Sequence, residues 1–348
     1  MKKITDLKWL SLGAIDGVVI FGGSWLTAAF LRMLSKTELK VALYTSPRHF
    51  DEVVESDNST LRCVTKSLGI KTIVTEDVNN EKSLSELITK QTLGISLGAA
   101  WVFESKTVKL FNGKLLDFMG IALPKYRGGA HYTWQILSNN KSGACNLQII
   151  YGGEESFHKG EIIKKSEYLF PESTRIPQDY FNFAIREEIL FLAEFLNEVH
   201  KEKNFSLVSL DESISSHYPF LNTKIQGWIN WSWSAEEIDR FICAFDDPYD
   251  GASTYLSESR VYLKGCEIVG KEEDFHPFHS GLLYRCSSSR IFIAVKGGAI
   301  SINQILNENG DNIIEDVQEG SRLFTPQSLI ESSLLFETEY VANGLKTI

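Results

Sequence analysis

The 348-residue sequence has little of several features that mark specialised classes of protein. No run of 18 or more apolar residues occurs, which disfavours a membrane-spanning helix. The five cysteines are an odd number and no two have CxxC spacing, so the sequence supports neither a zinc site nor a disulfide framework. The basic N-terminus is not followed by the apolar segment and cleavage site of a secretory signal. We therefore expect a cytoplasmic globular protein without a metal and without a membrane partner.

Basic charge is scarce in the C-terminal third. Residues 229–348 contain nine Lys and Arg but nineteen Asp and Glu, so this segment alone carries the net charge of −10 of the whole chain. Affinity for nucleic acid depends on neutralising phosphates with Lys and Arg. The charge distribution therefore disfavours a nucleic-acid partner on electrostatic grounds.

The first half of the chain alternates between short apolar segments and segments with helical spacing. This alternation predicts a parallel sheet covered by helices on both faces, with ligands outside the carboxyl ends of its strands. Gly22-Gly23 follows the first long apolar segment but no GxGxxG pattern does, so we interpret the pair as a tight strand-to-helix turn. The expected strands are 16–22, 39–45, 70–74 and 93–98, and the expected helices are 25–34, 59–68 and 83–89.

The second half changes character after a long amphipathic helix, predicted over 179–200. Residues 204–226 are polar, whereas the segments after Gly227 alternate apolar and polar residues between turns, which is typical of a small β-barrel. We expect an α/β domain with a doubly wound, mostly parallel sheet, followed by a small β-barrel domain. The expected boundaries are 1–205 for the α/β domain, 206–226 for a linker and 227–348 for the barrel.

One segment in each half resembles the folate-dependent formyltransferases, the family of the methionyl-tRNA and sugar N-formyltransferases. The stretch from Asp117 to Gly128 matches the family's Asn-x-His-x-Ser-Leu-Leu-Pro-x-x-Arg-Gly pattern through its Leu-Pro and Arg-Gly pairs. Gly160-Glu-Ile resembles the family's Gly-Asp-Ile. The segments 229–231, 235–245 and 248–252 resemble the opening of its C-terminal barrel. The resemblance covers most of the chain and implies the formyltransferase fold.

The resemblance places Asp117, Met119 and His158 where the family has its catalytic Asn, His and Asp. Formyl transfer develops an oxyanion that needs preorganised donors, and removing one such donor typically costs on the order of 10²–10³ in rate. Met119 has no donor, and Asp117 could donate only when protonated in an apolar pocket. The usual mechanism therefore requires replacements.

Three residues are candidate replacements: His131 and Arg127, which lie outside these positions, and His158, which occupies one of them. His131 and His158 could act as acid or base, and Arg127 is a nearby fixed cation. Each also has a structural interpretation. His131 could cap or pack a helix, His158 could lie in an exposed loop, and Arg127 could hold backbone carbonyls of its turn.

The donor that the resemblance implies is 10-formyltetrahydrofolate. In the family, the pterin is held largely by backbone groups of two loops, and backbone recognition survives side-chain changes. The corresponding residues here are Gly98, Ala99, Ala100, Trp101, Val102, Phe103, Leu123 and Pro124.

Three functions follow as hypotheses. The first is a formyl (or related one-carbon or acyl) transferase with a rebuilt site, acting on an amine and most plausibly on that of a nucleotide-linked amino sugar. The second is a catalytically silent folate- or sugar-binding homologue, and the third is a diverged methionyl-tRNA formyltransferase. Electrostatics disfavours the third, because the barrel is acidic and the loop 46–57 has four acids and one Arg. The protein could also form a homodimer.

Overall fold

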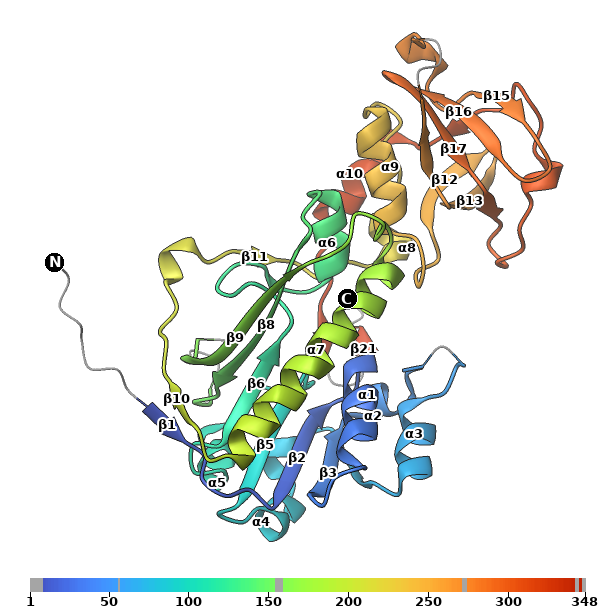
Figure 1. Ribbon diagram of the computed structural model, residues 1–348. Coiled ribbons are helices and arrows are strands. Elements are labelled where there is room, and N and C mark those ends of the chain that lie inside the picture. Colours follow the sequence, from blue (N-terminus) through green and yellow to red (C-terminus); the bar gives the residue numbers. More distant parts are fainter. Residues whose placement is uncertain (1–8, 56, 154–158, 271–273, 342–343, 346–348) are drawn as a thin grey trace, which may run out of the picture.

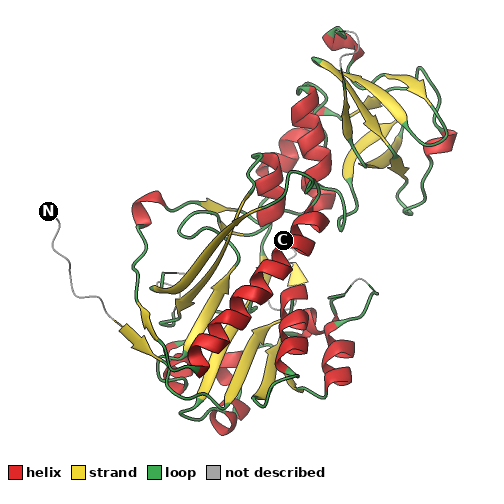
Figure 2. Cartoon of the chain, viewed as in Figure 1, coloured by secondary structure: helices red, strands yellow, loops and turns green. Residues whose placement is uncertain are grey.

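The structure is a computed structural model that describes residues 9–55, 57–153, 159–270, 274–341 and 344–345. A large α/β lobe and a smaller lobe made mostly of β-strands lie at opposite ends of an elongated molecule (Figure 1). Most helices lie in the larger lobe or where the two lobes meet (Figure 2). No helix in these ranges combines the length and apolar character needed to cross a membrane.

The large lobe contains a seven-stranded sheet of order β4-β3-β2-β5-β6-β8-β9. The first five of these strands are parallel, and β8 and β9 are antiparallel additions at one edge. The prediction of a doubly wound, mostly parallel sheet is confirmed. The strands are β2 (Gly17–Gly22), β3 (Lys40–Thr45), β4 (Lys71–Val74), β5 (Thr92–Leu97), β6 (Leu115–Met119), β8 (Ser142–Ile149) and β9 (Ile162–Leu169).

Helices cover both faces of this sheet. One face packs against α1 (Trp25–Leu34), α3 (Leu61–Leu68) and the long α7 (Pro177–His200). The opposite face packs against α4 (Ser83–Leu87) and α5 (Ser105–Leu110). Capping residues set the ends of several helices. The Ser24 hydroxyl accepts a hydrogen bond from the backbone N–H of Thr27 at the start of α1. Gly69, with a φ of +65°, ends α3. The shorter elements of this lobe are β1 (Trp9–Ser11), α2 (Pro47–Asp51), η1 (Val78–Asn80), β7 (Arg127–Gly128) and α6 (His131–Leu137).

The smaller lobe has two four-stranded antiparallel sheets, β18-β13-β12-β19 and β14-β17-β16-β15. Their inner side chains form one apolar cluster with helix α9 (Ala235–Ala244), which begins at a capping box of Ser234 and Glu237. The predicted small barrel-like domain is confirmed. Its elements are β12 (Ala252–Leu256), β13 (Ser259–Lys264), β14 (Glu267–Val269), η4 (Pro277–His279), β15 (Leu283–Cys286), β16 (Ile291–Val295), β17 (Gly298–Ile302), β18 (Gln304–Leu306), η5 (Ile314–Asp316) and β19 (Leu323–Phe324). The chain then returns toward the large lobe through α10 (Gln327–Leu335), β20 (Tyr340–Val341) and β21 (Gly344–Leu345), and β21 lies beside the large lobe (Figure 1).

Helix α9 joins the two lobes. It packs against α6, and the Thr133 hydroxyl donates to the carbonyl of Ala244 at 3.2 Å. The guanidinium of Arg175, just before α7, pairs with the buried carboxylate of Asp239 at 2.6 Å. The apolar cluster of the barrel continues without a break into α6 and α7. The lobes therefore share one core at their junction.

The polar segment predicted as a linker runs back along the large lobe and forms short elements there. Strand β10 (Asn204–Ser206) pairs with β1, and β11 (His217–Tyr218) pairs in parallel with β7. The segment also contains η3 (Glu212–Ile214) and α8 (Thr223–Gln226). We refer to residues 211–221 as the strap, because they lie across the turn that follows β6.

Candidate functional site

Strand β6 presents its residues alternately to the two faces of the sheet, and this alternation decides what Asp117 can contact. Phe118 points to the α7 face, where its ring lies 6.1 Å from that of Phe191. Asp117 and Met119 are on the opposite face. Met119 packs there against an apolar cluster that includes Leu123, whereas Phe118 does not block this face.

Two amide side chains of β8 share this face with Asp117. Asp117 is opposite Gln148 in the sheet register and Met119 is opposite Asn146. The Gln148 amide nitrogen donates to the Asp117 carboxylate at 3.2 Å. The Asn146 amide nitrogen donates to the carbonyls of Met119 and Ile121, which fixes the backbone at the end of β6. The face therefore carries a carboxylate and two amides, all buried.

Asn146 and Gln148 were not predicted as site residues. The signal in the sequence is an Asn and a Gln at alternate positions of an otherwise apolar segment, 143–149. Alternation places both on one face of a strand, and a buried polar side chain is unfavourable without a hydrogen-bond partner. The Asn146 carbonyl oxygen has no partner among the described residues, although the side chain is fully buried. It can therefore accept a hydrogen bond from a ligand.

Arg127 joins the Leu-Pro-x-x-Arg-Gly turn to the strap. Its guanidinium makes two hydrogen bonds to the carboxylate of Glu212, at 2.7 and 2.9 Å, and one to the Ser215 hydroxyl at 2.5 Å. These bonds lower the pKa of the Glu212 carboxyl below its ordinary value. This arrangement agrees with the structural interpretation of Arg127. Its carboxylate partner comes from the strap and not from the turn.

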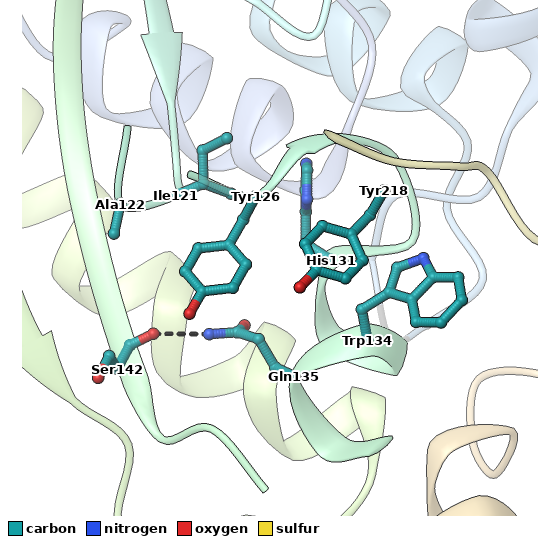
Figure 3. A pocket seen from close by; sticks show the side chains of 8 residues that line it. All are labelled: Ile121, Ala122, Tyr126, His131, Trp134, Gln135, Ser142 and Tyr218. Carbon is teal, nitrogen blue, oxygen red and sulfur yellow. Dashed lines mark hydrogen bonds between the residues drawn. The ribbon is translucent and has the colours of Figure 1, made fainter. Parts of the chain in front are cut away.

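His131 is the first residue of α6 and lines a small pocket. The lining residues are Ile121, Ala122, Tyr126, His131, Trp134, Gln135, Ser142 and Tyr218 (Figure 3). Neither Asp117 nor Met119 is among them. The structure therefore places His131 in a pocket whose first lining residue, Ile121, comes two residues after Met119 in the chain. A catalytic role for His131 stays a prediction.

His158 lies outside the described residues. The residues just before its loop are placed, and the backbone N–H of Gly153 donates to the carbonyl of Phe103 at 2.8 Å. After the loop, Glu161 accepts from the backbone N–H of Ile149 at 3.0 Å. The loop therefore begins beside the segment that follows β5, where the donor was predicted to bind.

That segment, from Gly98 to Phe103, follows β5 at the point where the strand order changes direction between β2 and β5. Gly98 has a φ of +73°, and a Cβ on Gly22 would lie 2.3 Å from the Leu97 carbonyl oxygen, so the two backbones are in close contact. Ligands of doubly wound sheets bind in this crevice.

The aromatic residues of this segment are held by the protein itself. The Trp101 indole N–H donates to the carbonyl of Glu76 at 2.8 Å, and the Asn79 amide donates to the carbonyl of Val102 at 3.0 Å. Phe103 is buried against Phe21. Ala99 packs in the same apolar cluster, and Ala100 lies between it and Trp101. Backbone groups and the Trp101 ring are thus the parts of this segment that could meet a ligand.

Leu123 and Pro124 are buried at the turn after β6, joined by a cis peptide bond. Leu123 packs with Ile121 and Ile162, apart from the cluster that contains Trp101 and Phe103. The predicted donor residues therefore form two groups at neighbouring strand ends.

A buried acid lies behind the turn. The Glu188 carboxyl of α7 is close to Gly120, since a Cβ there would lie 2.5 Å from Glu188 Oε1. Burial raises the pKa of Glu188 to about 7. Gly120 points to the α7 face, so Glu188 is separated by the sheet from Asp117. The sequence signal is an acid in the apolar row of α7, between Ala184 and Phe191.

The described ranges contain no group of three His, Cys, Asp or Glu side chains that could hold a metal ion. All five cysteines are free thiols, and Cys145, Cys243 and Cys266 are buried. Trp228 and Trp231 are also buried, in the core of the barrel, where the Trp231 indole donates to Thr254. They therefore pack the barrel.

Residues 222–320 match the family described as formyl transferase, C-terminal domain. Methionyl-tRNA formyltransferase from Clostridium tetani is 26% identical over 183 residues, which are 53% of this chain and 56% of that protein. The enzyme of the same name from Ruminiclostridium cellulolyticum is 25% identical over 222 residues, or 62% and 66% of the two chains. This chain therefore spans less than two thirds of the length of either relative.

Solved structures share the fold over a longer range. WlaRD, described as a sugar 3N-formyl transferase in the presence of dTDP and 5-N-formyl-THF, gives a TM-score of 0.60 at 17% identity, covering 85% of this chain and all of that one. An N-formyltransferase from Helicobacter canadensis in complex with folinic acid and dTDP-3-aminofucose gives 0.57 at 19% identity, covering 84% and 99%. HypX from Aquifex aeolicus in complex with tetrahydrofolic acid gives 0.55 at 14% identity, covering 91% and 47%. With the α/β sheet and the barrel-like lobe in the same order, this chain has the fold of these structures, and its residues 222–320 match the formyl transferase C-terminal domain.

Proposed function

We propose that this protein transfers a formyl group from a 10-formyltetrahydrofolate-type donor to the amine of a nucleotide-linked amino sugar. The observation that carries the proposal is the extent of the shared fold, because the full length of a sugar 3N-formyl transferase has a counterpart in this chain. The acidic barrel supports a small acceptor over a polynucleotide, since like charges repel a phosphate backbone. The match of residues 222–320 to the formyl transferase C-terminal domain supports a transferase.

The residues near β6 fit a folate-type ring. The fully buried Asn146 carbonyl oxygen accepts no bond from the described residues and suits an N–H of a pterin. The backbone of Gly98, without a side chain, allows a flat ring to come close. The donor supplies the formyl group, whose carbon is attacked by the amine nitrogen of the acceptor while its bond to the donor nitrogen breaks.

Asp117 is the candidate proton carrier of this reaction. The attacking amine loses a proton as the new C–N bond forms, and the donor nitrogen gains one as the old bond breaks. A single carboxylate can accept the first proton and deliver the second, so the charges balance. The Gln148 amide holds the Asp117 carboxylate in place. His131 and His158 remain candidates for assisting the same transfer.

The alternative is a catalytically silent homologue that binds folate or sugar. Its support is Met119, which cannot donate to an oxyanion. The second alternative, a diverged methionyl-tRNA formyltransferase, is supported by the names of the curated relatives. Each alternative predicts a different result in the experiments below.

The first experiment is a calorimetric titration with 5-formyltetrahydrofolate, a stable analogue of the donor. Micromolar binding is expected, followed by formation of a formamide product from a dTDP-linked amino sugar and 10-formyltetrahydrofolate. No binding at millimolar ligand would exclude the folate donor. Binding without product from amino-sugar nucleotides or from methionyl-tRNA would favour the silent homologue.

The carrier role of Asp117 is tested by Asp117→Asn. Because acid–base catalysis contributes typically 10²–10⁴-fold, kcat should fall by about 10²-fold or more while the affinity for 5-formyltetrahydrofolate changes little. Asp311→Asn, in an exposed turn of the barrel, is the matched control and should retain kcat. An unchanged kcat in Asp117→Asn would remove Asp117 from the mechanism.

A further inference from the structure

Helix α7 lies across one face of the sheet (Figure 1), and the buried side of this helix has one acid, Glu188. The residue is 6% exposed. Burial raises the pKa of its carboxyl to about 7, and no cation or hydrogen bond among the described residues opposes that rise. Because an unpaired charge is unfavourable in an apolar environment, the carboxyl is neutral in the folded protein below this pH.

The titratable groups near Glu188 are themselves weak acids. Burial raises the pKa of three of them above its ordinary value, namely Tyr132 of α6, Cys145 of β8 and Tyr168 of β9. Glu187, the preceding residue of α7, is also an acid. Asp117 of β6 lies on the opposite face of the sheet, and His131 of α6 lines the pocket shown in Figure 3. None of the three buried neighbours can become positive, so they cannot act as counter-ions.

The cations of the elements that pack against α7 are paired with other acids. Lys164 of β9 pairs with Glu194 and Glu198 further along the helix, at 3.1 and 3.0 Å. Arg32 of α1 pairs with Glu55 at 2.5 Å. An ionised Glu188 would therefore need water or a change of position to be stabilised.

The Glu188 carboxyl lies directly against the backbone of Gly120. A Cβ added to Gly120 would lie 2.5 Å from Glu188 Oε1, whereas the nearest atom of any other residue not adjacent in the chain, Phe118 Cε1, would be 3.8 Å away. On the opposite face, the Asn146 amide donates to the carbonyls of Met119 and Ile121, on either side of Gly120. Gly120 is therefore held between a side chain of β8 and a side chain of α7.

Gly120 begins the turn that leads to two of the predicted donor residues. The Leu123 N–H donates to the Ile121 carbonyl at 2.9 Å, and Pro124 follows Leu123. Asn146, whose carbonyl oxygen can accept from a ligand, donates to the same Ile121 carbonyl. A displacement of Gly120 would therefore change the positions of both Leu123 and Asn146.

We propose that Glu188 is a positioning residue for the donor: its carboxyl supports Gly120 from the α7 face and keeps residues 120–124 in the conformation that binds the folate-type ring. The inference rests on the proposed function, and it adds that a residue on the far face of the sheet controls the affinity for the donor. Glu188 acts through the backbone and not on the reacting atoms. When the carboxyl ionises, it must admit water or turn away from Gly120, and the support is lost.

The first test is calorimetric titration of the full chain with 5-formyltetrahydrofolate at pH 6 and pH 8. The neutral fraction of a group with a pKa of about 7 falls from about nine tenths to about one tenth over this interval, so the affinity of the wild type should fall about tenfold. Glu188→Gln keeps the size of the side chain without a titrating group, and it should bind with the same affinity at both pH values. Glu194→Gln, on the exposed side of α7, is the matched control and should follow the wild type.

A second test addresses the contact between the two residues. Gly120→Ala should weaken donor binding at pH 6 by about 5- to 10-fold, because the new methyl meets the Glu188 carboxyl. Glu188→Ala makes room for that methyl, so the double variant should bind the donor more tightly than Gly120→Ala alone. Additive losses in the double variant would show that Glu188 does not support Gly120.

The outcomes separate this inference from the proposed function. Donor binding with the same pH dependence in wild type and Glu188→Gln would overturn the inference and leave the transferase standing. Absence of donor binding at both pH values would overturn the proposed function and this inference with it. A residue with a purely structural role would change the free energy of unfolding with pH but leave the donor affinity of the folded protein constant. Circular dichroism at each pH shows whether a variant is folded, and if an Ala variant is not, the comparison of wild type with Glu188→Gln decides.

Discussion

At the scale of single residues, Glu188 is the clearest departure from ordinary packing. Its carboxyl is buried in the apolar row of α7, and burial raises its pKa to about 7 from an ordinary 4.5. The folded protein therefore binds this proton more tightly than the unfolded chain does. The stability from the neutral carboxyl is fully present below pH 4.5 and is lost as the pH rises through 7.

The corresponding prediction is that Glu188→Gln stabilises the protein at alkaline pH. A shift of this size corresponds to about 3 kcal/mol, so at pH 8 the unfolding free energy of the variant should exceed that of the wild type by up to that amount. At pH 4.5 the two should be similar. Urea unfolding at both pH values measures the difference, with Glu194→Gln on the exposed side of α7 as control. Parallel pH profiles of wild type and Glu188→Gln would contradict the buried, titrating carboxyl.

Residue-level reasoning from the sequence predicted some parts of the site and missed others. The positions of Asp117 and Met119 on one strand follow from the match to a known pattern. The hydrogen bond from Gln148 to Asp117 depends on the register of two antiparallel strands, and the register is set by long-range pairing. The local pattern places both amides on one face of a strand, but it contains no information about that pairing, so their position beside Asp117 could be seen only in the structure.

At the scale of elements, the strap depends on glycines that let it lie close to β7. A Cβ on Gly128 would lie 1.8 Å from the Tyr218 carbonyl oxygen, and Gly128 has a φ of +107°. Gly129 is in similar contact with the ring of Phe220. The strap can therefore remain in place only if these positions have no side chain.

We expect Gly128→Ala to displace the strap. The new methyl would collide with backbone, which cannot rotate away as a side chain can, so the β7–β11 pairing should be lost. Faster cleavage of residues 211–221 by a protease should follow. Gly113→Ala is the control, because Gly113 also has a positive φ, +83°, but its added Cβ meets nothing within 4 Å. Its cost should be limited to about 1–2 kcal/mol of backbone strain. Equal protease resistance of Gly128→Ala and wild type would argue against the strap contact.

The regular elements were predictable where local chemistry and periodicity agree, as in α1, whose predicted range 25–34 is the observed one. The strap was predicted only as a polar linker. Its order comes from backbone bonds to the β6–α6 turn and from the Arg127–Glu212 pair, which joins residues 85 positions apart. A polar segment of this kind has no periodicity that would indicate where it binds.

At the scale of the whole molecule, the two lobes are joined through Arg175. Its guanidinium pairs with Asp239 and donates to the Cys266 carbonyl at 3.1 Å. Burial raises the pKa of Asp239, and Arg175 opposes that rise. The sequence predicted both lobes, but the contact between them requires three segments to meet and could not be inferred from any one of them.

Removing this cation should destabilise the junction. Arg175→Ala would leave the Asp239 carboxylate buried without its partner, which we expect to cost about 2 kcal/mol of unfolding free energy, less than for a fully buried pair because Arg175 is partly exposed. Denaturant unfolding at pH 7 measures this loss. Adding Asp239→Asn to Arg175→Ala should recover part of it, since the second change removes the buried charge. No recovery would mean that the guanidinium stabilises the junction through packing instead.

The distribution of charge over the molecule leads to the last prediction. A transferase acting on tRNA would need cations that replace counterions along the phosphate backbone, and its affinity would fall steeply with salt, with a logarithmic slope near the number of phosphates contacted. Residues 229–348 carry ten more acids than bases. We therefore expect methionyl-tRNA to bind no more tightly than about 10⁻⁴–10⁻⁶ M at physiological salt, in the non-specific range. Fluorescence anisotropy with labelled tRNA between 50 and 200 mM salt tests this expectation, with dTDP titrated in parallel. Nanomolar tRNA binding with a steep slope would show that Lys and Arg side chains outside the barrel outweigh its acidic charge, and it would transfer the acceptor assignment from the sugar nucleotide to the tRNA of the curated relatives.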